Sequence, residues 1–379
     1  MIPRPTERKA GRLPWHPGIA DDSPRHVLFF TRGLGIGHAT RDVAILNELS
    51  EQCPQVRVTI ASYARGLPLL RSFGFRPIDL GLPPIGANNE RLLRIADLIR
   101  RLQPDLVVSD EELLALPIAK LAGIPSVLVT NWLIEEHHFL DATFMRSADE
   151  IIIPDLPDSF QQPGGLDVAT SYVGPIIRPF RHFPGEREEL RSELGMPKGA
   201  MTLCAIAAGS IPGDREFLET CVAMVDLLKQ DVLLIVLAGE LKAEMEALAR
   251  SDRRLRIHDF AFDLDALMVA SDLVICRGGH NTLWELAALG LPSISIPPKR
   301  ANNPMADVYA RNMAQRGTTI IIDEDELTPQ KLAEAVTALV ETELGNRLAN
   351  RGRQLTQKRG DAEAVAKILR NLPSRSPLR

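Results

Sequence analysis

The chain has 379 residues, of which 45% are hydrophobic and 25% charged, and its formal net charge is −5. This length favours two domains over one, and the acidic balance argues against a protein that coats nucleic acid, which needs surplus Lys and Arg. The four cysteines form no C-x-x-C pair and no apolar run approaches the ~18 residues of a membrane span, so we expect neither a zinc or redox motif nor a transmembrane helix.

Residues 1–24 are interpreted as a flexible tail, because they are rich in Pro and Arg and lack the apolar core of a secretory signal. The short apolar runs that follow predict two series of buried parallel strands, which alternate with helical patterns. The first series comprises 26–30, 56–61, 105–110, 126–130 and 150–154, and the second comprises 202–208, 232–238, 255–260, 272–278, 293–297 and 318–322. A last helix is predicted at about 350–371.

A stretch rich in Pro and Gly separates the two series at residues 173–188 and is typical of a linker. We therefore predict an α/β protein with two Rossmann-like domains, whose parallel sheets face a central cleft. The predicted divisions are an N-terminal domain at 25–174, a linker at 175–187, a C-terminal domain at 188–345, and a helix and tail at 346–379. Ligands of such sheets bind at the carboxyl ends of the strands, so the loops there are the candidate sites.

The loop after the first strand has the sequence GLGIGH and sets three glycines before a histidine. It is not the dinucleotide fingerprint G-x-G-x-x-G, because the third glycine would have to stand where the chain has His38. Glycines allow a ligand to approach the backbone, and an imidazole takes up a proton near neutral pH. The alternative is that His38 only begins the next helix.

The loop after the strand at 272–278 reads RGGHNT and precedes a helix predicted to start near Asn281. Thr282 and Glu285 have the spacing of a capping box, so these residues could serve only to begin the helix. A cap requires neither Arg277 nor two consecutive glycines. Helix N-termini attract phosphate, and a guanidinium binds phosphate oxygens, so we favour a phosphate site here.

The run from Arg277 to Glu285 resembles the donor-site signature of the UDP-glycosyltransferases of the GT-B fold. The nearest resemblance is to the bacterial peptidoglycan N-acetylglucosaminyltransferase-like enzymes with a family 28 C-terminal domain. The resemblance implies that Arg277 faces the β-phosphate, that Asn281 and Thr282 hold the α- or β-phosphate, and that Glu285 binds the ribose. The full set of implied donor-site residues is Gly209, Ser210, Phe260, Phe262, Arg277, Gly278, Gly279, Asn281, Thr282, Glu285, Asn302 and Asn303.

Two groups of these implied donor-site residues are less clearly indicated by the sequence. Phe260 and Phe262 lie where the family receives the uracil, although core aromatic residues would look the same. The family usually reads the donor sugar with an Asp/Gln pair, which is absent here, and Asn302 and Asn303 are the nearest candidates. The resemblance therefore does not identify the sugar.

The same resemblance gives the glycine-rich loop a role in acceptor binding. In this superfamily a glycine-rich loop after the first strand ends in a histidine that deprotonates the acceptor hydroxyl, and His38 stands at that position. Asp110 matches the aspartate that supports this histidine, with a helix cap as the alternative. The implied acceptor loop contains Gly33, Gly35 and Gly37.

The segment 88–104 predicts a basic helix with an apolar stripe. The stripe consists of Leu92, Ile95, Ile99 and Leu102. We interpret it as a surface helix whose stripe faces the core. The alternative is weak contact with an anionic membrane surface or with a lipid phosphate.

Together these motifs predict an inverting glycosyltransferase that moves a hexose or N-acetylhexosamine from a UDP-sugar to a hydroxyl. No metal and no cofactor besides the UDP-sugar co-substrate is expected. The expected acceptor is a small molecule or a lipid-linked hydroxyl, with no nucleic-acid partner, in the cytoplasm or peripherally at the inner face of the membrane. The alternatives are a sugar-nucleotide epimerase or hydrolase of the same fold, and a nucleotide-sugar-binding protein without turnover.

Overall fold

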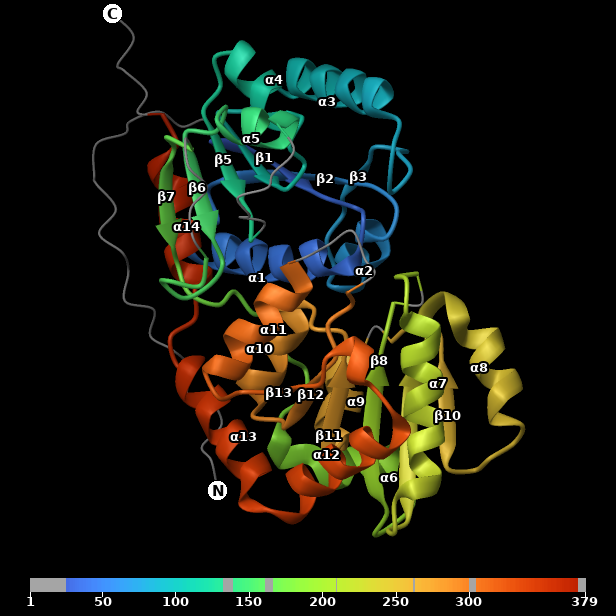
Figure 1. Ribbon diagram of the computed structural model, residues 1–379. Helices are drawn as coiled ribbons and strands as arrows, with labels where there is room; N and C mark the ends of the chain where they lie inside the picture. The colour runs from blue at the N-terminus through green and yellow to red at the C-terminus, as the bar shows by residue number, and fades with distance from the viewer. Residues whose placement is uncertain are drawn as a thin grey trace, which may run out of the picture. The chain divides into compact units, whose positions relative to one another are not determined.

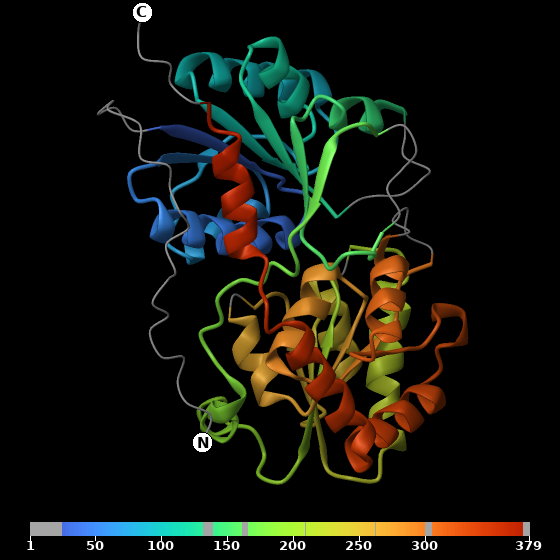
Figure 2. The same ribbon diagram turned by 90° about the vertical axis from the view of Figure 1, so that its left-hand side faces the viewer.

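The computed structural model describes residues 25–131, 139–160, 166–208, 210–261, 263–299 and 305–373. The chain divides into two compact units, which we call the first unit (Met1–Pro179 with Lys358–Arg379) and the second unit (Phe180–Gln357). Each unit holds one parallel sheet with helices packed on it (Figures 1 and 2). The predicted α/β architecture with two Rossmann-like sheets is confirmed.

The sheet of the first unit has the strand order β3-β2-β1-β4-β5-β6-β7. Its strands are β1 (His26–Thr31), β2 (Arg57–Ser62), β3 (Ile78–Asp79), β4 (Leu106–Asp110), β5 (Ser126–Val129), β6 (Glu150–Ile153) and β7 (Ala169–Tyr172). The edge strands β3 and β7 were not predicted, because they are short, partly exposed and lack a continuous apolar run. The predicted strands of the first series are all present.

Helices cover both faces of this sheet. They are α1 (Ile36–Gln52), α2 (Gly66–Ser72), α3 (Asn88–Leu102), α4 (Ala115–Leu121), α5 (Phe139–Met145) and α14 (Asp361–Arg370). Alternate residues of β1 face opposite sides. Val27 and Phe29 pack with α1, α2 and α14, whereas Leu28 and Phe30 pack with α3 and α4. The red helix α14, from the far end of the chain, therefore contributes to the same core as the blue helix α1 (Figure 1).

The sheet of the second unit has the strand order β10-β9-β8-β11-β12-β13. Its strands are β8 (Met201–Ile206), β9 (Val232–Leu237), β10 (Leu255–His258), β11 (Leu273–Cys276), β12 (Ser293–Ser295) and β13 (Ile320–Ile321). Its α-helices are α6 (Arg187–Glu193), α7 (Asp214–Met224), α8 (Lys242–Ala249), α9 (Leu264–Ala270), α10 (His280–Leu289), α11 (Met305–Gln315), α12 (Pro329–Glu341) and α13 (Glu343–Leu355). Short 3-10 turns include η4 (Glu324–Glu326). Alternate residues of β8 and β9 pack with α7 and α12 in one apolar core.

The predicted helix at about 350–371 is wrong, because the chain forms two helices there, α13 and α14. Between them the chain leaves the helix and pairs with the segment that follows β7. The N–H of Gly360 donates to the carbonyl of Pro175 at 2.7 Å. This tertiary contact, which local propensity does not reveal, decides where α14 begins.

The apolar stripe predicted on α3 is partly wrong. Ile95 and Ile99 are buried as expected, but Leu92 is exposed and Arg91 is buried in its place. The reason is a buried carboxylate, Glu112, that binds the Arg91 guanidinium at 2.8 Å. Among the described residues, no helix has both the length and the apolar content needed to cross a bilayer.

Candidate functional site

The first cluster of functional side chains lies where the strand order of the first sheet reverses. β1 and β4 are adjacent parallel strands, and Thr31 is paired with Asp110 at their carboxyl ends. The chain leaves β1 toward β2 on one side and leaves β4 toward β5 on the other. Such a switch point leaves a crevice outside the sheet, in which open α/β proteins bind ligands.

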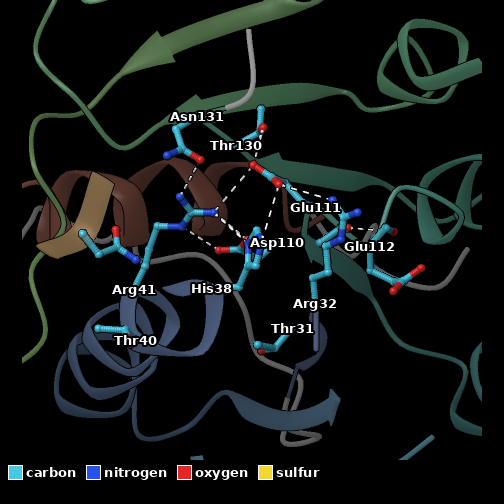
Figure 3. Close-up of polar contacts among 12 residues, drawn as sticks. Thr31, Arg32, His38, Thr40, Arg41, Asp110, Glu111, Glu112, Thr130 and Asn131 are labelled. Atoms are coloured by element: carbon cyan, nitrogen blue, oxygen red, sulfur yellow. Dashed lines mark hydrogen bonds and ion pairs between the residues drawn. The ribbon is translucent and has the colours of Figure 1, made fainter. Parts of the chain in front are cut away.

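The strand register brings His38 to Asp110. His38 lies in the first turn of α1, which begins at Ile36 after Gly35 as the N-cap. Its Nδ1 lies 2.7 Å from Oδ1 of Asp110 (Figure 3). A carboxylate can only accept hydrogen bonds, so Nδ1 carries the proton and Nε2 has the lone pair. The geometry thus leaves Nε2 as the nitrogen that can take a proton from a ligand.

Arg41, which the sequence analysis did not single out, completes this arrangement. Its Nε and Nη2 donate to the two oxygens of Asp110 at 2.7 and 2.6 Å, and its Nη1 donates to Asn131 at 3.1 Å. Arg41 follows His38 by three residues on α1, so both side chains lie on one face of the helix. That spacing is the one signal in the sequence that could have indicated its role.

The charge state of Asp110 follows from these contacts. Burial alone would raise the pKa of this fully buried carboxyl, but the Arg41 guanidinium and His38 beside it hold the pKa well below its usual range. Burial likewise opposes the charge on Arg41, yet Asp110 raises the pKa of Arg41 above its ordinary value. Asp110 is therefore an ionised anchor for Nδ1 of His38 throughout the physiological range.

A second carboxyl on α1, Asp42, behaves in the opposite way. Asp42 is fully buried, and its carboxyl lies beside Asp110 and Thr31. Burial and the negative charge of Asp110 raise the pKa of Asp42 well above its ordinary value. The raised pKa favours the neutral form of Asp42, which limits the negative charge in this part of the core.

The raised pKa of Asp42 predicts a pH-dependent stability. The folded chain holds a proton on Asp42 that the unfolded chain releases above about pH 4, so the free energy of unfolding falls as pH rises toward the folded pKa. Asp42→Asn removes this titratable group, so the free energy of unfolding of the variant is expected to fall less than that of wild type between pH 5 and pH 8. Urea unfolding at pH 5 and pH 8 measures the effect. An equal fall in both proteins would contradict this assignment.

The glycine-rich loop is held by a buried cluster of Tyr63, Arg91 and Glu112. The Tyr63 hydroxyl donates to Oε2 of Glu112 at 2.9 Å, and the Arg91 guanidinium lies 4.4 Å from the centre of the Tyr63 ring. Burial and the charge of Glu112 raise the pKa of Tyr63 to about 12, so its hydroxyl stays a donor. The backbone of Tyr63 packs against Gly33 so closely that a Cβ on Gly33 would overlap its carbonyl oxygen.

This packing predicts different effects for two neighbouring glycines. Gly33→Ala forces the loop away from Tyr63 and is expected to lower the free energy of unfolding by about 1–3 kcal/mol, the usual cost of overpacking. Gly35→Ala is the matched control, because the space around Gly35 is open and its backbone is extended. Urea unfolding of both variants measures the difference. Equal stability of the two variants would show that the contact with Tyr63 does not hold the loop.

The second cluster lies at the corresponding switch point of the second sheet, between β8 and β11. After β11, Gly278 has a φ of +75°, and a Cβ there would press against the carbonyl of Ala306 and the hydroxyl of Ser295. α10 then starts at His280 with Gly279 as its N-cap. The predicted start near Asn281 is confirmed to within one residue, but the capping box of Thr282 and Glu285 is wrong, because Gly279 takes the cap position and makes no side-chain cap hydrogen bond.

Arg277 is buried at this switch point and bound on two sides. Its Nε lies 3.1 Å from Asp214, and its Nη2 lies 2.6 Å from Glu324. Nη1 also donates to the carbonyl of Ile296 at 3.2 Å. The two carboxylates offset the guanidinium charge, and the role of Arg277 toward a phosphate stays a prediction. Neither partner was predicted, because Asp214 and Glu324 are remote from Arg277 in the sequence.

Glu324 also binds Lys299, the last residue that the structure describes before 300–304. Its Oε2 accepts the backbone N–H of Lys299 at 2.8 Å, while the Lys299 ammonium pairs with Asp325 at 2.6 Å. η4 thereby binds both Arg277 and Lys299.

The remaining predicted donor-site residues are placed as follows. Asn281 and Thr282 are half-buried in the first turn of α10, and Glu285 is buried one turn later. Ser210 and Phe260 are exposed. Gly209, Phe262, Asn302 and Asn303 lie outside the described residues.

Comparison with known proteins relates both units to glycosyl transfer. The model of the glycosyltransferase family 28 C-terminal domain matches residues 206–367. An uncharacterized glycosyltransferase of Methanopyrus kandleri is 29% identical over 253 residues, which cover 64% of this chain and 70% of that protein. The UDP-N-acetylglucosamine–N-acetylmuramyl-(pentapeptide) pyrophosphoryl-undecaprenol N-acetylglucosamine transferase of Desulforamulus reducens is 25% identical, with 88% of this chain and 94% of that protein covered.

Among solved structures, MurG of Acinetobacter baumannii superposes with a TM-score of 0.62 and 18% identity, covering 92% of this chain and the whole of that chain. This similarity concerns the fold. The sequence relatives carry the argument about activity.

Proposed function

Because the chain is a glycosyltransferase of the GT-B fold with a family 28 C-terminal domain, we propose that it transfers a sugar from a UDP-sugar donor to a hydroxyl acceptor. The proposed reaction inverts the anomeric centre, needs no metal, and moves a hexose or N-acetylhexosamine. The observation that carries the proposal is the 2.7 Å contact between His38 and Asp110, with Arg41 keeping Asp110 ionised.

His38 is the proposed general base. As the acceptor oxygen bonds to the anomeric carbon, its proton passes to Nε2 of His38, and the bond from that carbon to the β-phosphate oxygen breaks. UDP leaves with the electron pair. One displacement from the face opposite UDP inverts the anomeric centre. Asp110 holds the ring and offsets the positive charge that develops on it.

The proposed donor site is the N-terminal end of α10. Its backbone N–H groups and the helix dipole suit a diphosphate, and the two glycines before it allow the phosphates to come close. We propose that Asn281 and Thr282 donate to the phosphates and that Glu285 binds the ribose hydroxyls. Two carboxylates already bind the Arg277 guanidinium and offset its charge. We therefore propose that Arg277 attracts the β-phosphate electrostatically while it stays bound to these carboxylates.

The proposed acceptor is a hydroxyl of a small molecule or of a lipid-linked substrate. The printed name of the Desulforamulus reducens relative describes a lipid-linked acceptor, which supports the second option. A cytoplasmic enzyme with weak contact at the inner face of the membrane would suit such an acceptor. The basic helix α3 is where that contact is proposed.

Incubation of the full chain with UDP-N-acetylglucosamine or UDP-glucose, with and without a panel of sugar and polyprenyl-linked hydroxyl acceptors, tests the proposal. Acceptor-dependent release of UDP, with a β-linked product from the α-linked donor by proton NMR, is the expected result. Formation of an epimeric UDP-sugar without acceptor would identify an epimerase. UDP binding without any turnover would identify a binding protein, and both outcomes would overturn the proposal.

A further inference from the structure

Glu111, the residue after β4, has an unusual backbone and a buried side chain. Its φ is +53°, in the left-handed region that residues with a side chain rarely adopt. Such conformations cluster at functional sites, where the surrounding structure holds them in place. Only 4% of the Glu111 side chain is exposed, so the chain turns sharply after Asp110 and buries a second carboxylate.

This carboxylate lies at the side of His38 opposite Asp110. Thr130 donates its hydroxyl to Oε1 of Glu111 at 2.8 Å, which fixes the group. Oε2 then lies 3.7 Å from Nε2 of His38 and 3.5 Å from the Arg32 guanidinium. His38 thus contacts Asp110 through Nδ1 and Glu111 through Nε2, and Figure 3 draws these contacts as dashed lines.

The charges around His38 explain what this second carboxylate can do. Arg41 contacts both oxygens of Asp110 at 2.7 and 2.6 Å and lies 3.9 Å from Oε1 of Glu111, so its charge offsets mainly that of Asp110 before His38 takes up a proton. Burial and the charge of Asp110 raise the pKa of Asp42, which favours the neutral form of this neighbour. The buried groups Asp110, Arg41 and Glu111 therefore carry a net charge of −1, and an imidazolium on His38 brings the buried set to zero. Arg32 opposes Glu111, but 28% of its side chain is exposed and water screens its charge.

We propose that Glu111 is a positioning residue for the glycosyl transfer, which supplies the negative charge that the imidazolium of His38 needs at Nε2. This inference rests on the proposed function. In the transfer step the acceptor O–H bond breaks and its proton goes to Nε2, while the acceptor oxygen bonds to the anomeric carbon and UDP leaves with the electron pair. Glu111 forms no covalent bond and keeps its charge throughout.

The test is an NMR titration of the full chain with labelled histidine, in which the His38 resonance is identified by its loss in His38→Gln. Glu111→Gln keeps the acceptor for Thr130 but removes the charge. The titration midpoint of the His38 ring is expected to move toward acid by on the order of one pH unit, as for a nearby opposite charge. Arg32→Gln removes the opposing charge and is expected to move the midpoint toward alkali.

Opposite shifts from the two variants separate an electrostatic role from a structural one, because a distorted loop has no reason to produce them. Glu51→Gln, at the exposed end of α1, is the control and is expected to leave the midpoint unchanged. Glu111→Asp keeps the charge, so its His38 midpoint is expected to lie closer to the wild-type value than that of Glu111→Gln. This variant serves as the second test if Glu111→Gln perturbs folding. No shift, or shifts in one direction, would overturn the inference. The titration needs no turnover, so its failure and the failure of the proposed function are distinguishable.

Discussion

Replacing His38 by alanine is expected to lower turnover by about 10²–10⁴-fold, the usual contribution of a general base. The affinity for UDP is expected to stay within about twofold, since the proposed diphosphate site at α10 belongs to the other unit of the chain. The loss should therefore appear in kcat. Steady-state kinetics with a UDP-sugar, together with calorimetric titration of UDP, measures both quantities.

The control for this variant is Glu51→Gln, at the exposed end of the same helix, which is expected to retain most of the activity. Circular dichroism of His38→Ala checks that the fold is kept. An equal loss of UDP affinity in His38→Ala would contradict the assignment of His38 to the acceptor side. Undiminished turnover of His38→Ala would show that His38 is not the general base.

Breaking the buried pair of Arg41 and Asp110 is expected to have the largest effect on stability. Arg41 is 2% exposed and Asp110 is fully buried, so Arg41→Met leaves a carboxylate in the core without its main partner. Loss of one member of a buried pair typically costs about 3–5 kcal/mol. Equilibrium unfolding in urea measures the cost.

An exposed arginine with two carboxylate partners gives the matched control. Arg311 contacts Asp307 at 2.8 Å and Asp323 at 2.7 Å, but 45% of its side chain is exposed. Arg311→Met is expected to cost less than about 1 kcal/mol, because water screens such pairs. Similar costs for the two arginine variants would mean that Arg41 does not stabilise Asp110 in the core.

Most strands could be predicted from the sequence, because a strand that is buried on both faces consists of a short run of apolar residues. The misses have local causes. β3 and β7 lie at a sheet edge and lack such runs, and the boundary between α13 and α14 depends on a contact with Pro175. The cap of α10 was misassigned because Gly279, rather than a side chain, occupies the cap position.

The site was harder to predict because its side chains meet only through the sheet. The pairing of Thr31 with Asp110 in adjacent strands brings Asp110 to the first turn of α1. Helical spacing from His38 could have indicated Arg41, but its pairing with Asp110 depends on the contact between β1 and β4. Glu111 belongs to a run of three carboxylates that the sequence shows at the end of β4, but its left-handed backbone is visible only in the structure. Likewise, the two carboxylates that hold Arg277 come from α7 and η4, which are distant in the sequence.

The claim on which the mechanism depends is that ionised Asp110 fixes the proton of neutral His38 on Nδ1 and leaves Nε2 as the base. Nitrogen-15 NMR of the histidine rings at pH 8 measures this tautomer directly. The structure predicts a protonated Nδ1 and an unprotonated Nε2 in the wild-type chain, with the other tautomer gaining population in Asp110→Asn. A wild-type His38 with its proton on Nε2 would contradict the account.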